Sequence, residues 1–216
     1  MTPTVSLTTD IALFTLREGV LHLLLIERGI APFKGKWALP GGFVVDGESL
    51  EACARRELAE EAGVEDVYLE QLYTFGAPGR DPRGRVVTVA YVGLVPSDEL
   101  RPVGGSDASR AAWHSADALP PLAFDHAEIV ALARQRLTAK LDYTTIAFQF
   151  LPTTFTLSDA QAVYEAVGGA ELDKRNFRKA ILATGHLAET GEKRGGVGRP
   201  ASLYRLTDPS TVHITK

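Results

Sequence analysis

Three glutamates, Glu57, Glu60 and Glu61, are the side chains of this sequence best suited to chemistry. They lie in a segment of helical periodicity, and at about 100° per residue they share one arc of the helix. Clustered carboxylates on a rigid helix can hold hard cations such as Mg²⁺, which neutralise a diphosphate and orient a water for attack. The same cluster also fits a solvated acidic face. Arg56, four residues before Glu60, can restrain that side chain but cannot balance all three charges.

The helix that must position these glutamates has both of its ends marked in the sequence. Ser49 or its neighbour is the expected N-cap, and Gly63 is the expected C-terminal stop. Leu50, Ala54 and Leu58 recur at helical spacing and form an apolar stripe beside the acidic arc. We therefore expect a helix that packs against a core and carries the carboxylates beside its packed face.

The stretch from Gly42 to Val64 follows a longer pattern, G-x5-E-x7-R-E-U-x-E-E-x-G-U, in which U is an aliphatic residue. This pattern is the signature of the Nudix hydrolases, and the stretch resembles it without a departure. The matching residues are Gly42, Glu48, Arg56, Glu57, Leu58, Glu60, Glu61, Gly63 and Val64. The resemblance implies the Nudix fold, an α/β/α sandwich, and metal-dependent hydrolysis of a nucleoside diphosphate derivative.

The resemblance also implies roles for individual residues. Glu57, Glu60 and Glu61 would be catalytic metal ligands, and Arg56 would act with them by positioning their carboxylates. The backbone of Gly42 would shape the loop and belong to the metal site. The implied cofactor is Mg²⁺, with Mn²⁺ as an alternative.

Composition bounds the remaining possibilities. The chain has 216 residues, of which 45% are hydrophobic, so it can hold one large domain or two modest ones. No apolar run approaches the length of a transmembrane helix, and the N-terminus lacks the features of a secretory signal. The single cysteine, Cys53, excludes an internal disulfide framework and is interpreted as a packing residue. We expect a cytoplasmic protein with no membrane partner.

Charge is divided unevenly along the chain. Residues 1–142 carry 14 basic and 20 acidic side chains, whereas residues 143–216 carry 9 and 7. This asymmetry is consistent with two modules that have different partners. The sequence therefore predicts a first domain over residues 1–142 and a second domain over residues 143–216.

The first module alternates strand-like and helix-like segments, which indicates an α/β sandwich. Apolar runs flank a turn at residues 17–19 and predict a hairpin. The expected strands are 11–16, 21–27, 67–75, 86–95 and a short one at 111–114, and the second helix is expected at 125–141.

Several residues outside the acidic helix are candidates for ligand binding. Trp37 is either a stacking platform for a base or a lid on the core. Arg80, Arg83 and Arg85 lie in a turn-rich loop and suit bidentate contact with phosphate, although a salt-bridged surface loop is equally consistent with them. His114 and His126 are interpreted as structural histidines, with a catalytic role as the alternative.

The second module begins with an apolar connector at residues 142–151. Helices are predicted at 156–167, with its cap within 157–159, and at 172–183, where Asp173 can cap. The second of these helices should turn Phe177, Ile181 and Leu182 inward. A hairpin with strands at 186–189 and 202–206 should follow, with a basic, glycine-rich tip between them.

A helix, a turn, a basic helix and a basic hairpin follow one another in the order of a winged helix-turn-helix. The basic helix would enter the major groove, where Asn176 could read adenine and Arg175 or Arg178 guanine. The wing would hold phosphates. The predicted DNA-binding residues are Lys174, Arg175, Asn176, Arg178, Lys179, Lys193, Arg194 and Arg199. A solvated basic helix with a flexible hairpin is the alternative.

The combination of the two modules resembles the Nudix-related transcriptional regulators of NAD metabolism, the NrtR family. The resemblance implies a homodimer that binds operator double-stranded DNA and releases it on binding ADP-ribose or a related nucleotide sugar. Many members have a damaged Nudix signature, whereas this chain keeps it complete. A second hypothesis therefore stands beside regulation: the chain is principally an ADP-ribose pyrophosphatase whose winged helix serves dimerisation.

Overall fold

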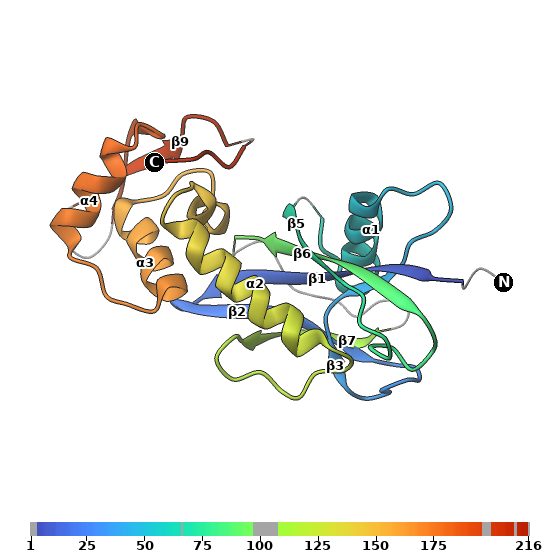
Figure 1. The fold of residues 1–216 in the computed structure, drawn as a ribbon. Coiled ribbons are helices and arrows are strands. Elements are labelled where there is room, and N and C mark those ends of the chain that lie inside the picture. The colour runs from blue at the N-terminus through green and yellow to red at the C-terminus, as the bar shows by residue number, and fades with distance from the viewer. Residues whose placement is uncertain (1–3, 66, 97–107, 196–199, 210, 216) are drawn as a thin grey trace. The chain divides into compact units, whose positions relative to one another are not determined.

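The computed structural model of the chain describes residues 4–65, 67–96, 108–195, 200–209 and 211–215. Contacts divide the chain into two compact units, shown with the elements labelled in Figure 1. The first unit comprises Met1–Thr15 and Leu21–Gln135, and the second comprises Leu16–Val20 and Arg136–Lys216. Each unit is described by itself below.

A mixed β-sheet forms the centre of the first unit. Its main path runs β3-β2-β1-β6-β5, while β4 pairs with β1 and β7 pairs with β2. The pairing of β1 with β6 is parallel, and β4, β5 and β7 pair antiparallel with their neighbours. The strands are β1 Ser6–Arg17, β2 Val20–Arg28, β3 Trp37–Ala38, β4 Gly41–Phe43, β5 Tyr68–Phe75, β6 Val86–Leu94 and β7 Ala108–Ser115. The strands expected from the apolar runs are therefore confirmed.

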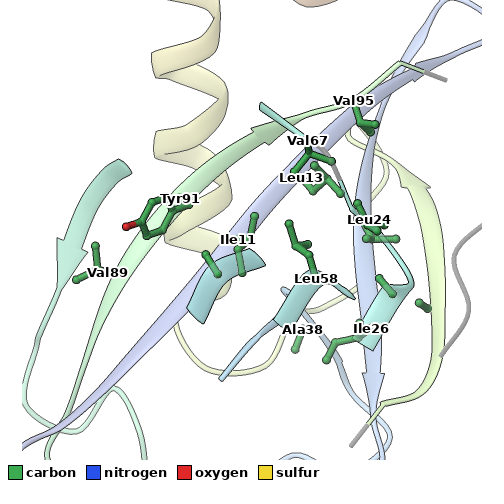
Figure 2. Close-up of a cluster of buried hydrophobic side chains, with 14 of the residues drawn as sticks. Ile11, Leu13, Leu24, Ile26, Ala38, Leu58, Val67, Val89, Tyr91 and Val95 are labelled. Carbon is green, nitrogen blue, oxygen red and sulfur yellow. The ribbon is translucent and has the colours of Figure 1, made fainter. Parts of the chain in front are cut away.

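Both faces of this sheet are covered. On one face, α1 (Leu50–Ala62) packs Ala54, Leu58 and Ala62 against Ile11 and Leu13 in the cluster drawn in Figure 2. Alternate strand residues point to opposite faces, and the intervening side chains of β1 at positions 12 and 14 are also fully buried. The helix α2 (His126–Leu141) buries one stripe of side chains and supplies the cover that this second face requires.

Local signals fix the ends of α1 where the sequence placed them. The Ser49 hydroxyl accepts a hydrogen bond from the Ala52 N–H, as an N-cap should. Gly63 adopts a left-handed conformation with φ 65°, and its N–H donates to the Ala59 carbonyl. Cys53 is fully buried, which confirms its interpretation as a packing residue.

The second unit is a small helical cluster with a two-stranded ribbon. Phe148, Phe155, Leu157, Phe177 and Ile181 belong to its buried core. Its elements are the 3₁₀ helix η1 Ile146–Phe150, the helices α3 Leu157–Gly168 and α4 Lys174–Ala183, and the antiparallel strands β8 Leu187–Arg194 and β9 Ala201–Leu206. The predicted order of helix, turn, basic helix and hairpin is confirmed.

Three details of this unit differ from the sequence prediction. The apolar connector contains η1, a short helix that local periodicity cannot reveal. The cap of α3 is Thr156, one residue before the predicted segment, in a reciprocal capping box with Asp159. Leu182 is 44% exposed rather than inward, because five steps of about 100° carry it well away from the buried Phe177.

The wing strand β8 is longer than predicted. Residues 190–194, expected in the tip of the hairpin, continue the strand, and Lys193 and Arg194 pair with Ser202 and Ala201 of β9. Polar side chains do not end a strand whose backbone partners continue opposite it.

None of the helices in the described part of the chain is both long enough and apolar enough to cross a membrane.

Candidate functional site

A cavity of about 340 Å³ lies in the first unit beside the acidic side of α1. Strand β1, strand β4, the loop at residues 80–83 and the first residue of α2 supply its other walls. Segments separated by more than a hundred residues in the sequence thus meet around one hollow. Charged side chains of both signs line it, together with the two aromatic rings of Phe43 and Phe124.

All three glutamates predicted as metal ligands line this cavity. Glu57 and Glu61 are buried, at 8% and 5% exposed, whereas the Glu60 side chain is about half exposed at 49%. The acidic arc is therefore not a solvated face: two of its three carboxylates have been moved out of water. Burial of like charges costs free energy unless a partner compensates.

The backbone at the start of β4 fits closely against these carboxylates. The Gly41 N–H donates to Glu61 Oε2 over 2.9 Å. A Cβ on Gly42 would lie 2.1 Å from Glu57 Oε1, so the carboxylate occupies the space that a side chain at this position would need. Glycine at residue 42 is required by this contact.

Arg56 is the cationic partner of the cluster. Its guanidinium lies 2.9 Å from Glu48, 2.6 Å from Glu57 and 3.3 Å from Glu60, and it also donates to the Phe43 carbonyl. The predicted contact of Arg56 with Glu60 is confirmed. One planar donor with five N–H groups thus orients three carboxylates and ties α1 to β4.

The environment of Glu61 favours a cation. Burial raises its pKa to about 8; the Gly41 N–H opposes this, and the nearby charges of Glu57 and Asp10 reinforce it. Burial also raises the pKa of Glu57, against the effect of Arg56. Carboxylates held in this condition gain from a nearby positive charge.

The donors fit a hard divalent metal by type. Carboxylate oxygens are the ligands that such ions take. No group of three or more His, Cys, Asp or Glu side chains within the described residues is poised to hold a metal ion. In this structure the Arg56 guanidinium provides the positive charge between Glu57 and Glu60.

Arg80 lies in the same cavity, but its charge is already taken. Its side chain is only 4% exposed and makes two bonds to Asp125, of 2.7 and 2.6 Å, and a contact of 3.4 Å to Asp10. These two carboxylates raise the pKa of Arg80 against the effect of burial. A phosphate that binds Arg80 would have to compete with Asp125.

His126 has the structural role that was the first interpretation of it. It is buried, and its Nδ1 accepts a 2.8 Å hydrogen bond from the Leu39 N–H. Nε2 therefore carries the proton of the neutral ring and faces Asp10 Oδ1 at 3.5 Å. Burial lowers the pKa of His126, although Asp10 opposes this.

Asp10 was missed by the sequence prediction. It is 7% exposed, and it joins Arg80 to His126 at the wall of the cavity. A signal was present: Asp10 is the single acidic residue in the strand Ser6–Arg17, most of which is buried. A buried acid in a central strand is rarely there without a partner or a role.

Arg83 lines the cavity next to two aromatic rings. Its guanidinium carbon lies 4.9 Å from the centroid of Phe43 and 5.5 Å from that of Phe124, and it pairs with Asp81 over 2.6 Å. The Arg83 partner lowers the pKa of Asp81 despite burial. Neither ring was expected in the site, because nothing in the local sequence places them together.

Two other ligand-binding candidates lie elsewhere. Trp37 packs edge-on against His114, at 4.4 Å between ring centroids, and has the Arg110 guanidinium over its face at 5.3 Å. The Arg85 side chain donates to the Gly76 carbonyl. Neither Trp37 nor Arg85 is among the residues that line the cavity, so the structure brings together only Arg80 and Arg83 from this set.

The second unit presents the basic helix as predicted. Asp173 caps α4 by accepting from the Asn176 N–H, and Phe177 and Ile181 point into the core. The polar residues of the predicted reading face are all exposed: Lys174, Arg175, Asn176, Arg178 and Lys179. Such a helix has one apolar side that anchors it and one basic side that is accessible to an anionic partner.

The basic residues of the wing differ among themselves. Lys193 is exposed on β8. Arg194 forms an ion pair with Asp159 and donates to the Thr156 hydroxyl at 3.2 Å, so it ties the wing to the N-cap of α3. Arg199, the third predicted wing residue, lies outside the described residues.

Comparison with known proteins finds both units. A NUDIX domain model matches residues 7–133, and a model of the NrtR DNA-binding winged helix domain matches residues 147–206. The "ADPR responsive transcriptional repressor NtrR" of Acinetobacter baylyi is 38% identical over 94% of this chain and 83% of its own. The chain belongs to the NrtR family.

Two further similarities add to this. A crystal structure of Shewanella oneidensis NrtR complexed with a 27mer DNA is 39% identical, covers 93% of each chain and has a TM-score of 0.84. The "ADP-ribose pyrophosphatase" of Methanocaldococcus jannaschii is 43% identical over 52% of this chain and 68% of its own. The fold is accordingly a Nudix α/β domain with a C-terminal winged helix, as the sequence predicted.

Proposed function

We propose that this protein is a transcriptional repressor that binds operator DNA through its winged helix and senses ADP-ribose, or a similar nucleoside diphosphate sugar, through its Nudix domain. The observation that carries the proposal is the joint presence of a charged cavity behind an intact Nudix signature and an accessible basic helix. Similarity along nearly the whole chain to an ADPR responsive repressor supports it.

In this proposal the diphosphate of the ligand binds in the cavity of the first unit. Glu57, Glu60 and Glu61, with the Gly42 backbone, would hold divalent metal, and Arg56 would keep the carboxylates in place. Mg²⁺ is the proposed ion and Mn²⁺ an alternative; when bound, it supplies charge neutralisation and an oriented water. Arg80 and Arg83 would contact phosphate, while Trp37 and Arg85 would act from outside the cavity wall if at all.

Arg80 connects ligand binding to a structural change. Its two bonds to Asp125 lie at the first turn of α2. A phosphate oxygen that replaces the Asp125 carboxylate would free the start of that helix. Such a ligand can shift a conformational equilibrium only by its difference in affinity for the two states.

The winged helix would provide DNA binding, with α4 in the major groove. We place the boundary between the two domains at residues 142 and 143, and we propose that the protein works as a homodimer in the cytoplasm. A dimer would favour a pseudo-palindromic operator with half-sites about one helical turn, or a multiple, apart.

A second function is favoured by a specific observation, the complete Nudix signature. All of its charged residues are present, and the Glu57, Glu60 and Glu61 side chains line one cavity. The protein would then also be an ADP-ribose pyrophosphatase that yields AMP and ribose 5-phosphate. If hydrolysis is its principal activity, the winged helix is accessory.

The test uses the Glu57→Gln variant, so that hydrolysis does not consume the effector. DNA fragments retained by the purified protein identify the operator, and ADP-ribose with Mg²⁺ is then titrated into the variant bound to labelled operator. We expect operator affinity to fall by a factor of about 5–150, and operator to weaken ADP-ribose binding by the same factor.

A flat operator affinity at saturating ADP-ribose and related sugars would refute the regulatory proposal. The pyrophosphatase activity is tested separately with wild type and the same variant. Glu57→Gln should lower turnover at least about 10²-fold if this carboxylate organises the transition state. A wild type without turnover would leave the cavity as a binding site only.

A further inference from the structure

The second unit contains a cavity of its own, of about 400 Å³. It lies between α4, the wing strands and the start of α3, and Arg178 of α4 and Lys193 of β8 are both in its wall. The register places Lys193 directly opposite Ser202 of β9, and the hydroxyl-bearing residues Ser202 and Tyr204 line the cavity too.

The two cations of this cavity have no counter-charge in it. Neither Arg178 nor Lys193 forms an ion pair or a hydrogen bond within the described part of the chain, and none of the residues that line the cavity is acidic. The nearest acid on α3, Asp159, is already paired with Arg194. The hollow therefore combines two free positive charges with hydroxyl donors, which is the chemistry of a phosphate site.

The start of α3 adds to this field. Thr156 and Leu157, the N-cap and first residue of the helix, line the same cavity. Unpaired N–H groups and the positive end of the helix dipole favour an anion there. Arg178 and Lys193 nevertheless carry the argument, since they supply full charges from two separate elements.

We propose that Arg178 and Lys193 together bind one backbone phosphate of the operator, in the cavity between the recognition helix and the wing. This inference rests on the proposed DNA-binding function. It assigns Arg178 to positioning α4 on the duplex, in place of the guanine contact that the sequence suggested. Base reading is left to the first turn of α4, where Arg175 and Asn176 are exposed.

The experiment places single neutral methylphosphonate linkages along the operator and measures its affinity for wild type, Arg178→Ala, Lys193→Ala and the double variant. On unmodified operator, each single variant should weaken binding about tenfold and reduce the salt slope by about 1. At one linkage, the methylphosphonate should remove the effect of both variants. The double variant should then bind unmodified operator little worse than either single one.

Lys179→Ala is the matched control. Lys179 is the next residue of α4, it is also exposed, and it does not line the cavity. Any loss of affinity in Lys179→Ala should persist at the linkage that silences the other two. All of these side chains are exposed, so circular dichroism should show folded variants.

The possible outcomes are distinct. If Arg178→Ala relaxes preference at one base pair and keeps the salt slope, Arg178 reads a base and this inference falls while DNA binding stands. If different linkages silence the two variants, the shared phosphate is refuted. If wild type retains no specific DNA at all, the proposed function itself fails, and the inference with it.

Discussion

Changing Glu61 to Gln is expected to flatten the dependence of stability on pH in the metal-free protein. The Glu61 carboxyl is 5% exposed and accepts the Gly41 N–H, a bond that the amide oxygen of glutamine can also accept. The substitution therefore removes a titrating group while it keeps the size of the side chain and its hydrogen bond. Only the electrostatic cost of burial should change.

The magnitude follows from the pKa of Glu61, which is about 8 in the folded protein against an ordinary value of 4.5. Between these values the folded state binds a proton that the unfolded chain has released, so stability falls as pH rises. The slope is about 1.36 kcal/mol per pH unit, so that from about pH 5.5 to about pH 7.5 the loss is about 2.7 kcal/mol. This contribution is absent from Glu61→Gln.

The assay is chemical denaturation in the presence of a chelator at several pH values, for wild type, Glu61→Gln and the control Glu60→Gln. The Glu60 side chain is half exposed, so Glu60→Gln should keep the wild-type slope. The free energies of unfolding of wild type and Glu61→Gln should diverge by about 2.7 kcal/mol across this window. Curves that stay parallel within about 0.5 kcal/mol would refute the reasoning. Added Mg²⁺ should reduce the slope of wild type alone if Glu61 is a ligand.

Three further substitutions test the contacts described above. Gly42→Ala puts a Cβ 2.1 Å from Glu57 Oε1 and should weaken Mg²⁺-dependent ADP-ribose binding by calorimetry; unchanged affinity would contradict a role for this contact. Asp125→Ala removes the two bonds to the buried Arg80 and should destabilise the protein by about 3 kcal/mol in denaturant, whereas a loss near zero would show that solvent replaces the carboxylate. Thr156→Ala removes the cap of α3 and should cost about 1 kcal/mol, measured by thermal unfolding, with Ser in its place as the conservative control.

The sequence by itself determined the acidic helix. Its caps at Ser49 and Gly63, its apolar stripe and its carboxylate spacing are all local features, because helical geometry repeats every few residues and each turn reports its own environment. The winged helix was predictable for the same reason: Asp173 caps α4, and Phe177 and Ile181 mark its inner side. These signals act within one element and need no partner to be interpreted.

Only the tertiary structure decided which distant residues share a site. Asp10 faces Arg80 because the long-range pairing of β1 with β6 sets where the loop before β6 lies. No local pattern could show that Arg80 would be buried and Arg85 left outside the cavity, since the two lie in one turn-rich loop.

The cavity that joins Arg178 to Lys193 likewise depends on how a helix and a strand pack in the second unit. A residue's spacing fixes which side of its own element it occupies, whereas its neighbours from other elements are set by packing of the whole chain. For this protein, the residue types of the acidic helix were therefore predictable, and their burial, their partners and the free energy of their charges were not.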